Sequence, residues 1–287
     1  MNKILLIIVL TAWFWMAACT PAPPATAQNP TESPNNTTAF PEITIDAADF
    51  SYTAPESINA GWVRVKLTNS GKEPHHVQFL RLNDEITFEG FQEALQKGPG
   101  AEMAISQLMG GVGAIAPNGS AQVVINLTAG EYVIICFVPS PSDHVPHLAK
   151  GMMKSLTVQE SSVTAAEPTA ELTVTMKDFL FDFPETLPAG SRIIKVVNNG
   201  PEAHEFNLLQ LKEGKTLEDV NEYLAEPNGP PPFIPVGGMN GLSVGKAGYM
   251  EFDFEPGTYV AICNIPSPQA EGHPHFTLGM IKQFSVP

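Results

Sequence analysis

The sequence has few cysteines and few basic residues for its length. Only three of its 287 residues are Cys, and 15 Lys and Arg face 30 Asp and Glu, for a formal net charge of −15. This acidic balance argues against nucleic acid as a partner and favours partners with a basic docking patch. With 43% hydrophobic residues, the chain can fill one large or two ordinary domains.

The N-terminus lacks an apolar run long enough for a typical spanning helix. It carries a single Lys3, a short apolar stretch and small residues before Cys19, which is typical of a secretory signal. The run Met16-Ala17-Ala18-Cys19 resembles the lipobox of bacterial lipoproteins, although Met replaces the usual Leu. We therefore predict a signal peptide at 1–19 with Cys19 lipidated; the alternative is an ordinary signal peptide in which Cys19 is incidental.

Residues 20–39 are rich in Pro, Ala, Thr and Asn and have almost no large apolar side chains. This composition predicts a disordered tether. The folded part would then lie outside the cytoplasm, in the periplasm or at the cell surface, anchored to a membrane by lipid. Cleavage before Cys19 removes one Lys and no acidic residue, so 14 basic and 30 acidic residues give the mature chain a charge of −16.

The remaining sequence repeats itself. NSGKEPHHVQFLRL at 69–82 matches NNGPEAHEFNLLQL at 198–211, and the Cys-containing segment at 130–152 returns at 257–280. A repeat of well over 100 residues has the size of a whole domain. We predict tandem domains at 40–159 and 171–287, joined by a polar linker at 160–170.

Each repeat has the pattern of a β-sandwich. Short apolar runs such as WVRVKLTN and EYVIICFV are separated by Gly, Pro and Asn turns. A Thr followed by spaced apolar residues predicts one short helix in each copy, at 87–97 and 216–226. The predicted fold class is all-β.

All seven His lie in the two repeated segments: 75, 76, 144, 147, 204, 273 and 275. Their confinement near two Cys and two Met indicates a site in each repeat. The alignment isolates two sets of four, listed as His75, Cys136, His147, Met152 and His204, Cys263, His275, Met280. It rejects His76, whose counterpart is Glu205, while His144 and His273 stand at different distances before their neighbouring His.

Two imidazoles, a thiolate and a thioether form a soft ligand set that suits copper in a type 1 site. On these residues the sequence resembles the cupredoxins, the plastocyanin and azurin family: NSGKEPH is similar to the plastocyanin segment Asn-x-Gly-x-Pro-His, and Tyr132 precedes Cys136 as in its copper strand. The resemblance implies Greek-key sandwiches and makes both sets of four copper ligands. One departure is the long loop, with ten residues between Cys136 and His147 and eleven in the second copy, a length that resembles the extended loop of copper nitrite reductase.

The patterns predict an electron carrier with two type 1 coppers and not an enzyme. Copper enzymes of this kind place a His directly before the type 1 Cys, where this chain has Ile135 and Ile262. The alternatives are a periplasmic copper-binding or delivery protein and a metal-free binding module. Two simpler interpretations of the cysteines are core packing and a disulfide between Cys136 and Cys263, which the geometry of equivalent strand ends disfavours.

Overall fold

The computed structural model describes residues 40–98, 100–163 and 165–287. The predicted signal, Cys19 and the whole predicted tether at 20–39 lie outside the described residues. In the described part of the chain, no helix is long and apolar enough to cross a membrane. The described residues from Phe40 to Pro287 form one compact unit, and the domain bounds at 40–159 and 171–287 and the linker at 160–170 therefore stay predictions.

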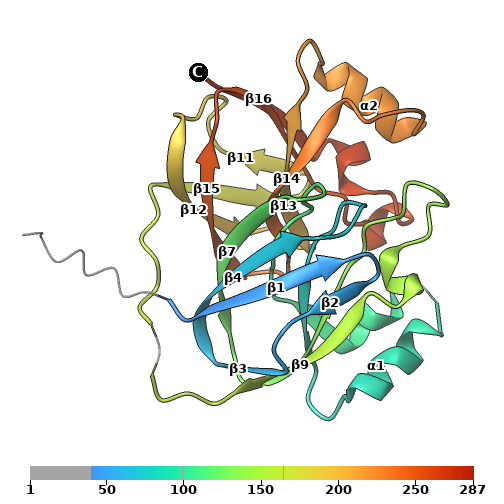
Figure 1. The fold of residues 1–287 in the computed structure, drawn as a ribbon, viewed down its shortest axis with the longest axis vertical. Helices are drawn as coiled ribbons and strands as arrows, with labels where there is room; N and C mark the ends of the chain where they lie inside the picture. Colours follow the sequence, from blue (N-terminus) through green and yellow to red (C-terminus); the bar gives the residue numbers. More distant parts are fainter. Residues whose placement is uncertain (1–39, 99, 164) are drawn as a thin grey trace, which may run out of the picture. The chain divides into compact units, whose positions relative to one another are not determined.

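The first repeat contains two sheets and a helix (Figure 1). One sheet has the order β2-β1-β4-β7 and the other β6-β5-β8-β9-β3. The bounds are β1 (Glu42–Ala48), β2 (Ser51–Thr53), β3 (Ser57–Asn59), β4 (Gly61–Asn69), β5 (Gln78–Leu82), α1 (Phe88–Leu95), β6 (Ser106–Leu108), β7 (Ser120–Leu127), β8 (Gly130–Ile135) and β9 (Met153–Gln159).

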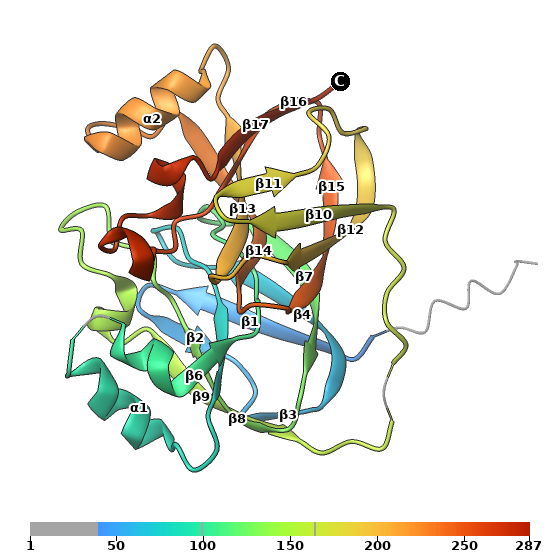
Figure 2. The same ribbon diagram turned by 180° about the vertical axis from the view of Figure 1, so that it is seen from behind.

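The second repeat has the same plan, with sheets β11-β10-β12-β15 and β14-β13-β16-β17 (Figure 2). The bounds are β10 (Leu172–Lys177), β11 (Leu180–Asp182), β12 (Gly190–Asn198), β13 (His204–Leu211), α2 (Leu217–Ala225), β14 (Phe233–Leu242), β15 (Ala247–Phe254), β16 (Gly257–Ile262) and β17 (Ile281–Val286). The predicted all-β sandwich class, with one short helix per repeat, is confirmed.

Alternation of side chains explains why these segments are strands. Along β4, every second residue is buried, and Val63, Val65 and Leu67 fill the core while their neighbours face outward. The helices begin where the sequence predicts, because Thr87 and Thr216 cap them by accepting a backbone N–H with their hydroxyls.

The two repeats are joined by strands that are equivalent to each other. β7 pairs antiparallel with β15, which merges two four-stranded sheets into one of eight strands. At the 127-residue offset Gln122 corresponds to Tyr249 and Val124 to Glu251, and the register pairs Tyr249 with Val124 and Glu251 with Gln122. Exchange of equivalent partners is the property of a two-fold interface. The repeats therefore pack as the subunits of a symmetric dimer do.

A second contact between the two repeats, called the crossing below, follows the same two-fold symmetry. Segment 109–116 of the first repeat lies along β14 of the second, with the bridges Met109–Leu242, Val112–Met239 and Ile115–Val236. The outer two bridges exchange under the same offset, and the central bridge joins the equivalent residues Val112 and Met239. The crossing requires glycine because backbones approach closely here.

Gly238→Ala is expected to destabilise the chain strongly. Gly238 has φ +123°, and a Cβ there would lie 2.3 Å from the carbonyl oxygen of Phe206. Strain and overlap together are expected to cost about 2–5 kcal/mol. Gly245, at φ +75° with nothing within 4 Å of its Cβ position, is the control and should lose only about 1–2 kcal/mol on substitution by Ala. Urea unfolding measures both, and equal losses would show that the backbones of β13 and β14 do not approach closely at Gly238.

Candidate metal centres

The ligand candidates of the first repeat come from four separate places in the chain. His75 lies between β4 and β5, where its backbone forms a bridge with Ile115. Cys136 directly follows β8, His147 begins a short 3₁₀ helix, and Met152 directly precedes β9. Strand pairing of β8 with β5 and β9 thus brings residues 77 positions apart to one end of the sandwich.

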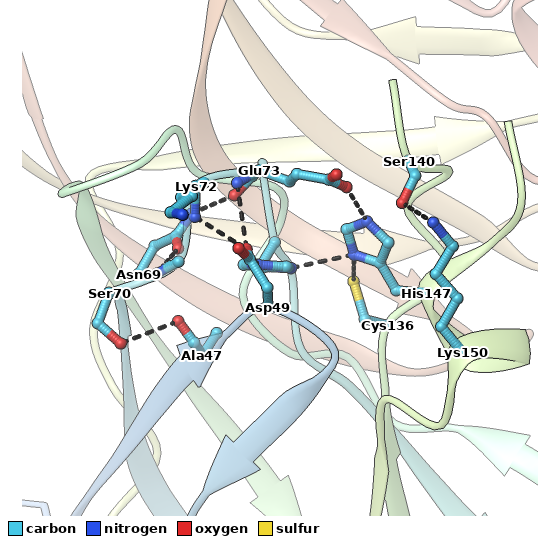
Figure 3. Close-up of polar contacts among 12 residues, drawn as sticks. Ala47, Asp49, Asn69, Ser70, Lys72, Glu73, Cys136, Ser140, His147 and Lys150 are labelled. Atoms are coloured by element: carbon cyan, nitrogen blue, oxygen red, sulfur yellow. Dashed lines mark hydrogen bonds and ion pairs between the residues drawn. The ribbon is translucent and has the colours of Figure 1, made fainter. Parts of the chain in front are cut away.

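The structure gathers His75, Cys136 and His147 into one buried group. The two Nδ1 atoms are 3.0 Å apart, and Cys136 Sγ lies 3.5 Å from His147 Nδ1. All three side chains are fully buried, and the possible ligand atoms lie within 4.8 Å of one another. Figure 3 shows the sulfur of Cys136 facing the ring of His147.

The second repeat builds the same group from His204, Cys263 and His275. The two Nδ1 atoms are again 3.0 Å apart, and Cys263 Sγ lies 3.3 Å from His275 Nδ1. These side chains are also fully buried. Neither Cys136 nor Cys263 forms a disulfide.

Backbone hydrogen bonds hold Met152 and Met280 next to the Cys and the second His of their groups. Cys136 N–H donates to the carbonyl of Met152 (3.2 Å), and Met152 N–H donates to that of His147 (2.9 Å). Met280 makes the same two bonds in the second repeat, with Cys263 and His275. Both Met side chains are fully buried.

The loops between Cys and the second His are long, but hydrogen bonds within each loop bring its two ends together beside the ligand candidates. In the first repeat, Ser140 N–H donates to Val145 O (3.0 Å) and His147 N–H to Val138 O (2.9 Å). In the second, Ser267 N–H donates to His273 O at 2.9 Å. The extra residues of each loop therefore project away from the site, and the hydrogen-bonded ends keep the Cys and the His in place.

The Nε2–H of every His in the two groups donates a hydrogen bond to a carboxylate. The pairs are His75 with Asp49 (3.1 Å), His147 with Glu73 (2.8 Å), His204 with Asp178 (2.6 Å) and His275 with Glu202 (3.0 Å). A carboxylate only accepts, so the proton sits on Nε2 and the lone pair of Nδ1 faces the other ring. Burial lowers the pKa of His75, His204 and His275, which keeps these rings neutral at pH 7.

The donor atoms fit a metal ion. Two nitrogens about 2.0 Å from one ion lie about 2.8–3.3 Å apart for bond angles between a right angle and the tetrahedral angle, and the observed separation is 3.0 Å in both groups. Two lone pairs facing each other at this distance repel unless a cation or proton lies between them. His–Cys–His with a nearby Met is a set that copper prefers.

The thiols are protonated until a metal binds. Burial raises the pKa of Cys136 to about 11 and the pKa of Cys263 well above its usual range. A metal must therefore displace a proton from each sulfur, and binding weakens as pH falls.

The other three His are outside both groups. His76 is buried, but its Nε2 accepts the backbone N–H of Phe137 at 2.7 Å. Its counterpart Glu205 accepts the N–H of Asn264 in the same way, at 2.8 Å. His144 and His273 are exposed.

Sequence reasoning missed the residues that orient the ligands. Asp49 and Phe50 recur as Asp178 and Phe179 at the offset of 129 that relates His75 to His204. Phe50 packs edge-on against His147 at 5.2 Å, and Phe179 against His275 at 4.9 Å. The repeated Asp-Phe pair was the available signal, as was the Glu that stands two residues before each of the first His ligands.

The two groups are well separated. His75 bridges Ile115, which bridges Val236, whereas His204 pairs with Leu242 six residues further along β14. Three strand spacings of about 4.8 Å and six residues of about 3.3 Å separate the two His backbones by roughly 25 Å. Each group would therefore hold its own ion.

No family model and no curated protein matches the sequence. Among solved structures, the chain is similar to reduced auracyanin from the photosynthetic bacterium Roseiflexus castenholzii (20% identity, 42% of this chain and 98% of that chain, TM-score 0.28). It is also similar to auracyanin A, a blue copper protein from Chloroflexus aurantiacus (19%, 41% and 98%, 0.27), and to blue copper oxidase from Nitrosomonas europaea (14%, 86% and 86%, 0.26). Because identities are 20% or lower and TM-scores are below 0.3, the chemistry of the centres rests on the residues of this chain.

Proposed function

We propose that the chain is an extracytoplasmic blue copper protein that carries single electrons, with one type 1 copper in each repeat. The observation that carries this proposal is the closed ligand set: all eight predicted ligands are fully buried. When bound, copper supplies a one-electron change of oxidation state. His75, Cys136, His147 and Met152 would hold the first ion, and their four counterparts the second.

A closed ligand set supports electron transfer over catalysis on a substrate. Two surface clefts of the described chain lie elsewhere: one is lined by Pro184, Leu187 and Arg192, and a larger one by Lys66, Tyr259 and the chain around Pro235. Neither cleft contains a ligand candidate. Four protein donors at each centre would leave no open position on the ion for a substrate.

The carboxylate partners support the same role. Because Asp49 and Glu73 hold the outer nitrogens of His75 and His147, the inner nitrogens keep one orientation whether or not an electron has been added. A site that moves little between oxidation states exchanges electrons with little reorganisation.

Copper storage or delivery is the competing function, because thiolate and thioether ligands also suit Cu(I). The two functions differ in one experiment. The electron carrier is expected to be blue when it holds Cu(II). Ascorbate should remove the colour after supplying one electron per copper, and oxidation by ferricyanide should restore it. A delivery protein would stay colourless and give up Cu(I) readily to a chelator.

We further propose that Cys19 carries a lipid and that the chain docks a basic redox protein. The exposed acidic residues Glu89 and Glu93 on α1, and Glu218 and Glu222 on α2, contribute to the negative surface. Attraction to a positive partner accelerates encounter and is screened by salt.

Reduction by a basic donor protein is therefore expected to be salt-sensitive. The second-order rate constant should fall at least about tenfold between 10 and 200 mM salt, because steering at low ionic strength raises on-rates by about 10- to 1000-fold. Stopped-flow mixing measures this rate, with an uncharged hydroquinone as the control reductant. If the rate constant for reduction by the basic donor does not change with salt concentration, the docking is not electrostatic.

A further inference from the structure

The two centres have the same ligand candidates but differ in the surface that covers them. In the first repeat, Phe50 packs against His147, and the ammonium group of Lys150 lies 4.7 Å from the centre of the Phe50 ring. This ammonium group also donates to the hydroxyl of Ser140 at 2.6 Å and pairs with Asp143 at 2.9 Å (Figure 3). A charged side chain therefore covers this side of the first centre.

A second lysine stands beside the first centre. Lys72 is exposed, and its backbone N–H donates at 2.8 Å to Asp49, the carboxylate that accepts from His75. Figure 3 shows Lys72 next to Asp49. The surface over the first centre therefore carries two positive charges.

The second repeat has apolar residues at the same places. The offsets that relate His75 to His204 and His147 to His275 equate the pairs Ser51 with Leu180, Lys72 with Pro201 and Lys150 with Leu278. Leu180 is 53% exposed, Pro201 is exposed, and Leu278 is half-buried. We call Leu180, Pro201 and Leu278 the apolar patch.

The apolar patch lies directly beside the second centre. Phe179, directly before the first residue of the patch, packs edge-on against His275 at 4.9 Å. A Cβ on Gly279, directly after the last residue of the patch, would lie 3.8 Å from the carbonyl oxygen of Phe179. A Cβ on Gly200, directly before the remaining patch residue, would lie 2.6 Å from a carboxylate oxygen of Asp178. The three segments that carry the patch therefore meet over the second centre.

An acidic helix stands beside the apolar patch. Phe276, in the same short helix as the last residue of the patch, packs against the cluster that contains Val220 of α2. Figure 2 shows this short helix (red) next to α2 (orange), on which Glu218 and Glu222 are exposed. In the first repeat, α1 stands in the same place and exposes two Glu as well. The two surfaces therefore share an acidic edge and differ in the lysines.

We infer that the redox partner docks on the second repeat, over the apolar patch, and not over the first centre. This rests on the proposed function, because the partner is the basic redox protein proposed there. The core of a protein interface is depleted of charged residues, Lys among them, and its rim is polar; the apolar patch and the acidic edge of α2 have this pattern. Over the first centre, a basic partner would meet like charges on Lys72 and Lys150 and would have to remove water from them. Electrons would therefore pass between partner and chain at the second centre.

Backbone NMR shifts of the full, isotope-labelled chain, recorded without copper, test the inference with a basic cytochrome as the probe. At low salt we expect the shifts to concentrate around the apolar patch, at 178–180, 200–202 and 276–279. The corresponding part of the first repeat should shift little. Shifts that concentrate in the first repeat, or that are equal in both, would overturn the inference and leave the proposed function standing if the chain turns blue with Cu(II). A chain that takes up no copper would overturn the proposed function and this inference with it.

A matched pair of variants tests the patch itself. Leu180→Lys is expected to weaken binding of the same cytochrome by about fivefold or more, the loss that follows when an anchoring side chain of an interface is removed. Val163→Lys is the control, because Val163 is apolar, 81% exposed and outside the patch, and the variant adds the same charge. The affinity of Val163→Lys should stay close to that of the wild type. Equal affinities of the two variants would overturn the inference, and so would patch shifts that follow the concentration of the chain alone, because the patch would then bind a second copy.

Discussion

Replacing either Cys136 or Cys263 with Ser is expected to remove half of the blue absorbance and one of two bound coppers. The thiolate gives the type 1 site its character, and a hydroxyl is a poor ligand for this set. Because the two groups lie roughly 25 Å apart, estimated from strand spacing and rise, loss of one should not affect the other. Metal analysis and the visible spectrum of each variant check this.

The double variant Cys136→Ser/Cys263→Ser provides the control and should bind no type 1 copper. Its thermal unfolding without metal should match that of the wild type closely, because the substitution barely changes the volume of either core. If one single variant loses all colour and the other loses none, only one repeat holds a type 1 site. That outcome would contradict the proposal of two equivalent carriers in one chain.

Glu202→Ala is expected to lower the copper affinity of the second centre by about 10- to 100-fold, the usual cost of removing a group that orients a metal ligand. Glu202 accepts from His275 at 3.0 Å and also from the hydroxyl of Ser267 at 3.0 Å, and its side chain is 5% exposed. Without it, the ring can place a proton on Nδ1, where the metal should bind. Competition with a copper chelator measures the affinity.

Two further variants make this prediction specific. Glu202→Gln keeps a carbonyl acceptor and should restore part of the affinity. Glu213→Ala removes an exposed carboxylate away from the centre and should leave affinity unchanged. If Glu202→Ala behaves like Glu213→Ala, the carboxylate does not orient His275.

The sequence alone revealed the ligand candidates because the repeat acts as an internal comparison. A His kept as His75 and His204 stands out from His76, which is Glu205 in the other copy. The same comparison predicted the helices, whose Thr87 and Thr216 caps depend only on nearby residues. Local signals of this kind survive folding unchanged.

The packing of the two repeats against each other could not be predicted from the sequence. Pairing of β7 with β15 depends on two edges meeting, and the alternation that predicts each strand says nothing about which strand lies beside it. Asp49 and Asp178 were missed for a related reason, since each lies 26 residues before the His that it holds and only the folded chain brings them together. Their shared offset becomes meaningful once the contact is known.

Titration of the mature, metal-free chain with Cu(II) tests the central claim most directly. With both thiols first verified as reduced, we expect an intense blue colour that saturates at two coppers per chain, one for each His–Cys–His group. Absence of blue colour and of bound copper would contradict the account, and His75, Cys136, His147 and their counterparts would then be core residues.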